Sequence, residues 1–196
     1  GNLRAVAKRM RDLPAELEAE KVDVRKEDKT IKSFTIPAQQ DINGDIVTFT
    51  TVPLLKKGIP KQVKLELKLR KNKHLQLSGP NGIGKTTLLE SLANATAEGI
   101  VIQEGIRVGY YRQDFGTLDF NQTVYQSLSE TALAVSGKID EQHIRAVAAG
   151  FLITGDMVHT KIGSLSEGQK GLVAFAKLVL TEPGLLILDE PTNHIN

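Results

Sequence analysis

The sequence predicts an α/β fold in which a parallel sheet carries a phosphate-binding loop. A glycine-rich loop, Gly79–Thr87, lies between an apolar segment and a helical pattern. A wholly apolar run, Leu185–Leu188, has the composition of a strand buried on both faces of a parallel sheet. Apolar and charged residues alternate over Val63–Arg70, as in a strand with one solvated face.

Composition narrows the class of protein. The chain has 196 residues, 25 Lys plus Arg, 23 Asp plus Glu and a formal net charge of +2. With 40% hydrophobic residues, it fits neither a collagen-like nor a disordered class. The absence of Cys excludes disulfides, thiolate catalysis and Cys-based metal sites. We find no apolar run of about 18 residues and no signal peptide, and expect a soluble cytoplasmic protein with no membrane span.

The predicted elements alternate between strands and helices. Strands are expected over Ile31–Ile36, Ile46–Val52, Val63–Arg70, Leu75–Ser78, Ile100–Gln103, Val108–Tyr111 and Leu185–Leu188. Helices are expected from Lys85, over Thr123–Leu133 and Glu141–Gly150, and from Ser166 to Leu180, with Thr123, Asp140 and Ser166 as N-caps. Before them, Leu3–Lys29 has a helical and then a strongly charged pattern, which is typical of a linker.

Basic residues concentrate in one segment. Lys56–Lys73 holds eight Lys or Arg side chains against Glu66 alone. One interpretation is an exposed strand face whose charges protect a sheet edge. The other is a contact with a phosphate backbone.

The glycine-rich loop is the strongest chemical motif. It reads Gly79, Pro80, Asn81, Gly82, Ile83, Gly84, Lys85, Thr86, Thr87, which is the phosphate-binding loop pattern. Its glycines let successive N–H groups point at phosphate oxygens, and the helix that follows adds its positive end. Lys85 is expected to reach the β- and γ-phosphates, and the Thr86 hydroxyl to ligate Mg²⁺. The alternative is a glycine-rich turn that matches by chance.

Two acids follow the apolar run. In parallel sheets, ligands bind at the carboxyl ends of the strands, so Asp189 is expected beside the phosphate loop. Asp189 can hold Mg²⁺ directly or through water. Glu190 can orient or deprotonate the attacking water.

The run Leu165-Ser166-Glu167-Gly168-Gln169 resembles the Leu-Ser-Gly-Gly-Gln signature of the ATP-binding cassette (ABC) family, with Glu167 in place of the first glycine. The resemblance implies that Ser166, Gly168 and Gln169 contact the γ-phosphate of ATP held on an opposite cassette. Ser166 is also an ordinary N-cap candidate. The resemblance further implies that Gln113 contacts Mg²⁺ and the water and links the core to a helical subdomain.

The resemblance implies a P-loop NTPase fold of three parts. These are an antiparallel β subdomain at about 31–77, a RecA-like parallel-sheet core at about 75–117 and 166–196, and a helical subdomain at about 118–165. Together they form an ABC nucleotide-binding domain over 31–196, preceded by a charged helical linker tail over 1–30. The family's D-loop is the loop that follows the acidic strand. We expect this domain to be truncated at the D-loop, with the C-terminal part of its core missing.

The run from Asp189 to Asn196 resembles the Asp-Glu-Pro-Thr-Asn-His-Leu-Asp run of the class F (ABC-F) branch, which comprises soluble paired-cassette ATPases. It implies that the chain is a linker tail plus most of a second cassette. The implied partners are another cassette and a ribosome or other ribonucleoprotein, through ribosomal RNA or tRNA. Asn196 departs from the usual aspartate, and His194 is expected in the inter-cassette loop rather than as the catalytic base. No aromatic residue for adenine stacking occurs near Pro60; Phe49, the nearest, is as readily a core residue.

Three functions remain open at this point. The first is an ABC-F-type ATPase that uses ATP and Mg²⁺ to close on a second cassette. The second is the nucleotide-binding subunit of a transporter. The third is a binding module that holds nucleotide and engages a partner without turnover, which Glu167, Asn196 and the lack of the family's switch histidine favour. A composite site would also leave an isolated cassette inactive.

Overall fold

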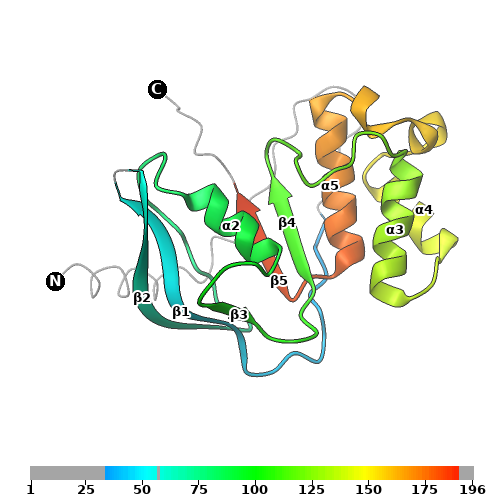
Figure 1. Cartoon of the computed structure of the whole chain (residues 1–196). Helices are drawn as coiled ribbons and strands as arrows, with labels where there is room; N and C mark the ends of the chain where they lie inside the picture. The colour runs from blue at the N-terminus through cyan, green and yellow to red at the C-terminus, as the bar shows by residue number, and fades with distance from the viewer. Residues whose placement is uncertain (1–33, 57, 190–196) are drawn as a thin grey trace. The chain divides into compact units, whose positions relative to one another are not determined.

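The computed structural model describes residues 34–56 and 58–189 (Figure 1). The predicted linker tail, Glu190, His194 and Asn196 lie outside these residues. The elements are β1 (Asp45–Lys56), β2 (Ile59–Arg70), α2 (Lys85–Ala93), β3 (Ile100–Ile102), β4 (Val108–Arg112), α3 (Val124–Ser136), α4 (Glu141–Gly150), two 3-10 helices (Gly155–His159 and Ile162–Ser164), α5 (Glu167–Thr181) and β5 (Leu185–Asp189). The fold is the predicted mixture of α and β structure, with one antiparallel and one parallel sheet.

The antiparallel sheet has the strand order β2-β1-β3. The strands predicted over Ile46–Val52 and Val63–Arg70 are confirmed, and both extend further toward the turn that joins them. Gly58 takes a φ of 78° in this turn, a left-handed conformation that favours glycine. β2 is an edge strand in the described part of the chain, and Figure 1 shows it on the outer side of β1.

The parallel sheet pairs β4 with β5, with Val108 opposite Leu185 and Arg112 opposite Asp189. Gly109 allows β4 to lie close to α5, because a Cβ atom there would come within 2.9 Å of Leu178. The short strands predicted at Val108–Tyr111 and Leu185–Leu188 are therefore confirmed in position.

The expectation that β5 is buried on both faces is wrong. Leu185 and Ile187 are buried against α2, but Leu186 is 40% exposed and Leu188 50% exposed. α2 covers one face of the β4–β5 pair, whereas on the other face α5 packs on β4 and leaves these two leucines uncovered (Figure 1). The apolar composition of a strand favours burial on both faces. Whether both faces are buried depends on the helices that pack on them.

The strand predicted over Leu75–Ser78 does not form. Residues 34–36, the described part of the strand predicted over Ile31–Ile36, are not in a strand either. A strand is stabilised by a hydrogen-bonded neighbour, and none of the described strands pairs with Leu75–Ser78. Leu75 and Leu77 are accordingly 43% and 37% exposed. The phosphate loop is therefore entered from a segment without regular secondary structure rather than from a strand.

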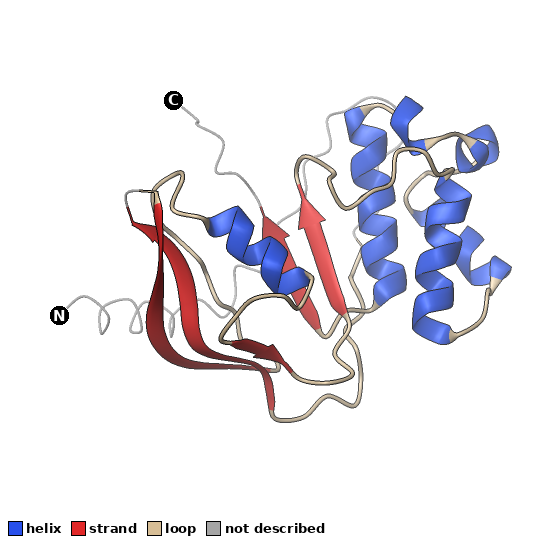
Figure 2. Cartoon of the chain, in the orientation of Figure 1, coloured by secondary structure: helices blue, strands red, loops and turns tan. Residues whose placement is uncertain are grey.

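The helices α3, α4 and α5 gather away from the antiparallel sheet, as Figure 2 shows. Their predicted N-caps are all confirmed: the side chains of Thr123, Asp140 and Ser166 each accept a hydrogen bond from a backbone N–H three residues on. The core between these helices is fully buried at Leu128, Ile144, Ile162 and Val173.

Candidate functional site

The loop Gly79–Gly84 adopts a conformation that its glycines make possible. Gly82 has a φ of 79° and Gly84 a φ of 98°, both in the left-handed region that side chains disfavour. Gly84 is the N-cap residue of α2, and its carbonyl accepts from the N–H of Leu88 at 2.9 Å. The backbone therefore turns sharply into the helix at the point where the sequence predicts phosphate binding.

Lys85 folds back across this loop. Its Nζ donates to the carbonyl oxygens of Gly79 at 2.5 Å and Pro80 at 3.0 Å. The first turn of α2 contains no acidic residue, so no carboxylate of that turn competes for the helix N-terminus. Thr86 and Thr87 follow in this turn and are exposed. Free N–H groups, an ammonium and a hydroxyl at one helix end are a donor set that fits a polyphosphate with a bound Mg²⁺.

The β1–β2 hairpin lies against the phosphate loop. The N–H of Leu55 donates to the carbonyl of Ile83 at 3.1 Å, and the Leu55 side chain would be 3.5 Å from a Cβ added at Gly84. This contact ties the hairpin to the end of the loop where α2 begins. Phe49, the candidate for adenine stacking, is 4% exposed in the core and does not line this surface.

The predicted residues Gln113 and Asp189 lie at the same edge of the parallel sheet. Asp189 is the last residue of β5 and pairs with Arg112, the last residue of β4. Gln113 follows directly and is exposed. α2 packs on both strands, so the helix that leaves the phosphate loop reaches this sheet. Among the described residues, no group of three or more acidic or histidine side chains is arranged so that it could hold a metal ion by itself.

Arg112 is a site residue that the sequence reasoning missed. Its Nη1 lies 3.3 Å from the carboxylate of Glu90 in α2, and its Nη2 lies 2.6 Å from Asp114. The hydrogen bond from Arg112 holds the pKa of the Asp114 carboxyl below its usual range, with a further contribution from the N–H of Gly116. Arg112 thus joins the segment that carries Gln113 to the helix of the phosphate loop. An Arg two residues before an Asp, at the end of a strand, was the available signal.

The signature residues form a helix cap. The Ser166 hydroxyl accepts from the N–H of Gln169 at 3.2 Å, and the Gln169 side chain accepts from the N–H of Ser166 at 2.9 Å. The N-cap interpretation of Ser166 is therefore confirmed. A Cβ at Gly168 would meet little besides the Ser166 hydroxyl, 4.0 Å away, so this helix end is open. Glu167 lies exposed in the first turn, where its charge stabilises the helix and opposes an incoming anion.

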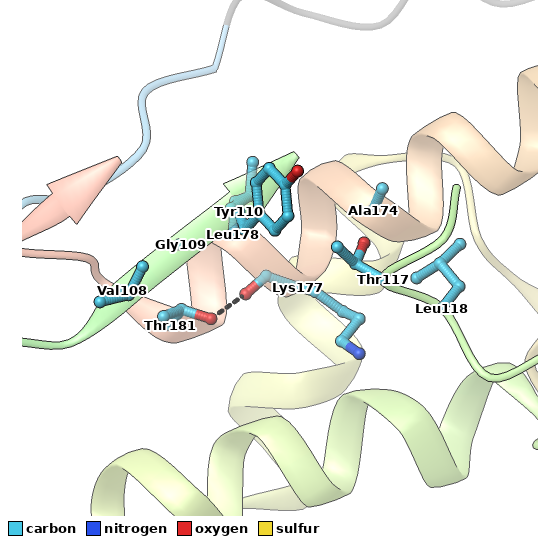
Figure 3. Close-up of a pocket in the computed structure, with 9 residues that line it drawn as sticks. All are labelled: Val108, Gly109, Tyr110, Thr117, Leu118, Ala174, Lys177, Leu178 and Thr181. Atoms are coloured by element: carbon cyan, nitrogen blue, oxygen red, sulfur yellow. Dashed lines mark hydrogen bonds between the residues drawn. The ribbon is translucent and has the colours of Figure 1, made fainter. Parts of the chain in front are cut away.

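Two small cavities lie beside β4, and neither is lined by the phosphate loop or the signature. One, of about 200 Å³, is lined by residues of both β4 and α5. Figure 3 shows Lys177 and Tyr110 among its lining residues. Burial lowers the pKa of the Lys177 ammonium. The other, of about 290 Å³, lies under Arg112 and Glu90.

Tyr110 lines both cavities. Its hydroxyl is buried and has no hydrogen-bond partner within the described ranges. Burial raises the pKa of Tyr110, and the charge of Asp189 raises it further. Tyr110 pairs with Ile187, two residues before Asp189 in β5.

No helix within residues 34–189 has both the length and the apolar character to cross a membrane. A family model described as ABC transporter matches residues 63–193. This range includes the phosphate loop, Gln113, the signature, Asp189 and Glu190.

Individual proteins agree with the family model. The chain is 36% identical over 140 residues to "Putative ATP-binding protein YdiF" of Bacillus subtilis, covering 70% of this chain and 21% of that protein. It is 34% identical over 140 residues to "Elongation factor 3B" of Saccharomyces cerevisiae, covering 68% of this chain and 12% of that one. The chain thus spans less than a quarter of the length of these two relatives.

Among solved structures, cbiO1 from Clostridium perfringens, part of the ABC transporter complex cbiONQ, superposes with a TM-score of 0.54 at 24% identity. The superposition covers 79% of this chain and 68% of cbiO1. This likeness shows the P-loop NTPase fold of an ABC cassette. Taken with the family match and the sequence relatives, it shows that the chain belongs to the ABC transporter family, as an ATP-binding cassette of the ABC-F type.

Proposed function

We propose that this cassette binds ATP with Mg²⁺, closes on a second cassette and hydrolyses the nucleotide in the site between them. The observation that carries the proposal is the phosphate loop: left-handed glycines lead into a helix whose first turn offers N–H groups, Lys85 and a threonine hydroxyl. A tetraanionic triphosphate is the ligand class that this donor set favours.

In this proposal the loop residues Gly79–Thr87 hold the phosphates, and Lys85 releases its two carbonyl contacts to bind the β- and γ-phosphates. Mg²⁺, when bound, neutralises charge on the phosphates and orients them for attack. Thr86, Gln113 and Asp189 are its proposed ligands. Glu190, outside the described residues, orients or deprotonates the water.

Two helix N-termini support a composite site. The phosphate loop opens α2 and the signature opens α5, and these helices lie on opposite sides of the β4–β5 pair (Figure 1). This arrangement supports a cassette that presents each helix end to a different nucleotide. Ser166, Gly168 and Gln169 are proposed to contact the γ-phosphate held by the second cassette.

The proposed target is the ribosome or another ribonucleoprotein, engaged through ribosomal RNA or tRNA. The relatives support this choice, since one of them is named as an elongation factor. The alternative is a transporter subunit, which the fold of cbiO1 would suit equally. The third function, a nucleotide-binding fragment without turnover, is the expected behaviour of the isolated chain.

The test compares steady-state ATP hydrolysis by this chain alone with hydrolysis by a chain that carries two cassettes. We expect turnover only from the paired form, and co-sedimentation of the paired form with ribosomes rather than with membranes. Full turnover by the isolated chain would contradict the composite site. Exclusive membrane association would favour the transporter alternative.

A further inference from the structure

The antiparallel sheet has one packed face and one open face. Val47 and Phe49 of β1 are buried in a core cluster that includes Leu88 and Leu92 of α2, and the half-buried Leu67 and Leu69 of β2 pack against this cluster. Side chains one residue along point the other way. On that open face, the cross-strand neighbours Lys68, Thr48 and Val101 form a row, and Val101 is 66% exposed.

This open face continues into a basic surface along the edge strand. Within Ile59–Lys73 the described basic side chains are all exposed, and Glu66 is the single acid. They are Lys61, Lys64, Lys68, Arg70, Lys71 and Lys73. We call this set the β2 basic surface.

One carboxylate opposes part of this charge. Asp45 lies 2.9 Å from the Lys68 ammonium and 2.8 Å from the Arg70 guanidinium. Hydrogen bonds from Lys68 and Arg70 lower the pKa of the Asp45 carboxyl. In the described part of the chain, Lys64 and Lys71 form no ion pair, so their charges are available to a partner.

We propose that the β2 basic surface binds the phosphate backbone of RNA. A strand rises about 3.3 Å per residue, so Lys64 to Arg70 extends over roughly 20 Å, and Lys71 and Lys73 lengthen the surface further. A nucleic-acid strand carries one charge per about 3.4 Å of helix axis, so a row of this length faces several phosphates at once. The Thr48 hydroxyl, opposite Lys68, adds a donor of the kind that contacts phosphate oxygens.

Protection of the sheet edge explains the distribution of basic residues less completely than RNA binding does. Charges that prevent pairing at a sheet edge are needed on the strand itself. Here the basic run continues past Arg70 into the turn, where the N–H of Lys73 donates to the carbonyl of Arg70 and no strand edge remains. A membrane surface is also less suited, because basic surfaces that enter a bilayer present large apolar side chains on the same face. Val63 of β2 pairs with Val52 of β1, which is buried in the core, so Val63 belongs to the packed face.

This inference deepens the proposed action on a ribonucleoprotein and rests on that proposal for its partner, but it does not depend on ATP. The experiment uses the whole chain and a fluorescein-labelled single-stranded RNA of mixed sequence, with anisotropy followed across a KCl titration. Each phosphate contact on a single strand contributes about 0.7 to the slope of log affinity against log salt. The variant Lys64→Gln/Lys71→Gln should therefore lower the slope by about 1.4 and weaken binding by about twentyfold at roughly 0.1 M salt.

The matched control is Lys138→Gln/Lys161→Gln, which removes the same charge from exposed lysines of the helical part. It should bind RNA within about twofold of the unaltered chain, because distant surface charges are screened. Equal weakening by both pairs would show a general charge effect and overturn the proposal, as would an unchanged Lys64/Lys71 variant.

Two further measurements distinguish RNA from other anionic partners and the RNA proposal from the ATPase proposal. Polyglutamate and phosphatidylserine vesicles should compete weakly with RNA or not at all, and binding to either that matches RNA would overturn the choice of partner. Lys85→Ala should keep full RNA binding. The same variant should lose nucleotide binding, because Lys85 is proposed to contact the phosphates of ATP. Nucleotide binding that persists would contradict the ATPase proposal alone, and RNA binding that is lost would contradict the RNA proposal.

Discussion

Arg112 and Glu90 form an ion pair in which Nη1 and the carboxylate oxygen are 3.3 Å apart, and this pair joins the end of β4 to the helix of the phosphate loop. The guanidinium also reaches Asp114 and is only 20% exposed, so the contact is partly shielded from solvent. Gln113 lies between Arg112 and Asp114 in the sequence. The position of the segment proposed to contact Mg²⁺ is thus coupled to the position of α2.

We predict that Arg112→Met lowers the free energy of unfolding by about 1 kcal/mol, because the largely shielded guanidinium loses its ion pairs with two exposed carboxylates. Urea denaturation measures the change. Arg145→Met is the matched control, since the Arg145 pair with Glu141 is exposed on both sides. An exposed pair contributes about 0.5 kcal/mol or less, so the control should scarcely change. Equal effects from the two substitutions would contradict the importance of the Arg112 contact.

Acid should weaken the same contact. The pKa of Asp114 is lowered from its ordinary 3.8, so its stabilising contribution is complete above that value and is lost as the pH falls through the folded-state pKa. The measurement is stability against pH below neutrality, with and without Arg112→Met. The two curves should converge at the acid end, and curves that stay parallel would show that the pair with Asp114 contributes nothing.

Gly84→Ala should impair nucleotide binding. With a φ of 98°, Gly84 needs a left-handed conformation that costs a side chain roughly 1–2 kcal/mol, and relief of that strain would move the first turn of α2. We expect about tenfold weaker binding of a fluorescent ATP analogue. Gly150→Ala is the control, because Gly150 has space around it and no left-handed φ. If both variants bind alike, the loop does not need the observed conformation.

Glu167→Gln should raise ATP hydrolysis by a paired-cassette form. The carboxylate stabilises the N-terminus of α5 but repels a phosphate there, so its removal should lower helix stability by about 0.3–1 kcal/mol. The matching gain in phosphate attraction corresponds to roughly a two- to fivefold higher rate. Thermal unfolding and turnover are measured on the same variant. Unchanged turnover would indicate that the signature of this cassette does not face a phosphate.

Lys177→Met should change how stability depends on pH. Burial lowers the pKa of Lys177 below its ordinary 10.5, so between the folded-state pKa and 10.5 the unfolded chain binds more protons. Stability from this group therefore rises as the pH rises through that window. The variant should lose this alkaline rise and be more stable at neutral pH, whereas Lys138→Met, on an exposed lysine, should do neither. Chemical denaturation at several pH values decides between these outcomes.

The structure separates what a sequence encodes locally from what depends on distant neighbours. Thr123, Asp140 and Ser166 were predictable as N-caps because a cap needs only residues a few positions away. The absence of a strand at Leu75–Ser78 was not predictable, because a strand needs a partner that periodicity does not specify.

The site shows the same division. The phosphate loop and Asp189 are predicted from motifs that are local in sequence, and Gln113 from the resemblance to the family. The ion pair of Arg112 with Glu90 joins residues 22 positions apart, and only the packing of α2 on β4 brings them together. The exposure of Leu186 and Leu188 likewise depends on where α5 lies, which their own sequence does not record.

The most direct test of the account is ATP binding by the whole chain with Lys85→Ala compared with Glu190→Gln, followed by fluorescence of a labelled ATP in the presence of Mg²⁺. Lys85 supplies a proposed charged contact to the phosphates, so its loss should weaken binding at least about a hundredfold. Glu190→Gln should bind as well as the unaltered chain and, in a paired form, should retain ATP without hydrolysing it. Unchanged binding by Lys85→Ala, or normal hydrolysis by Glu190→Gln, would contradict the proposed site.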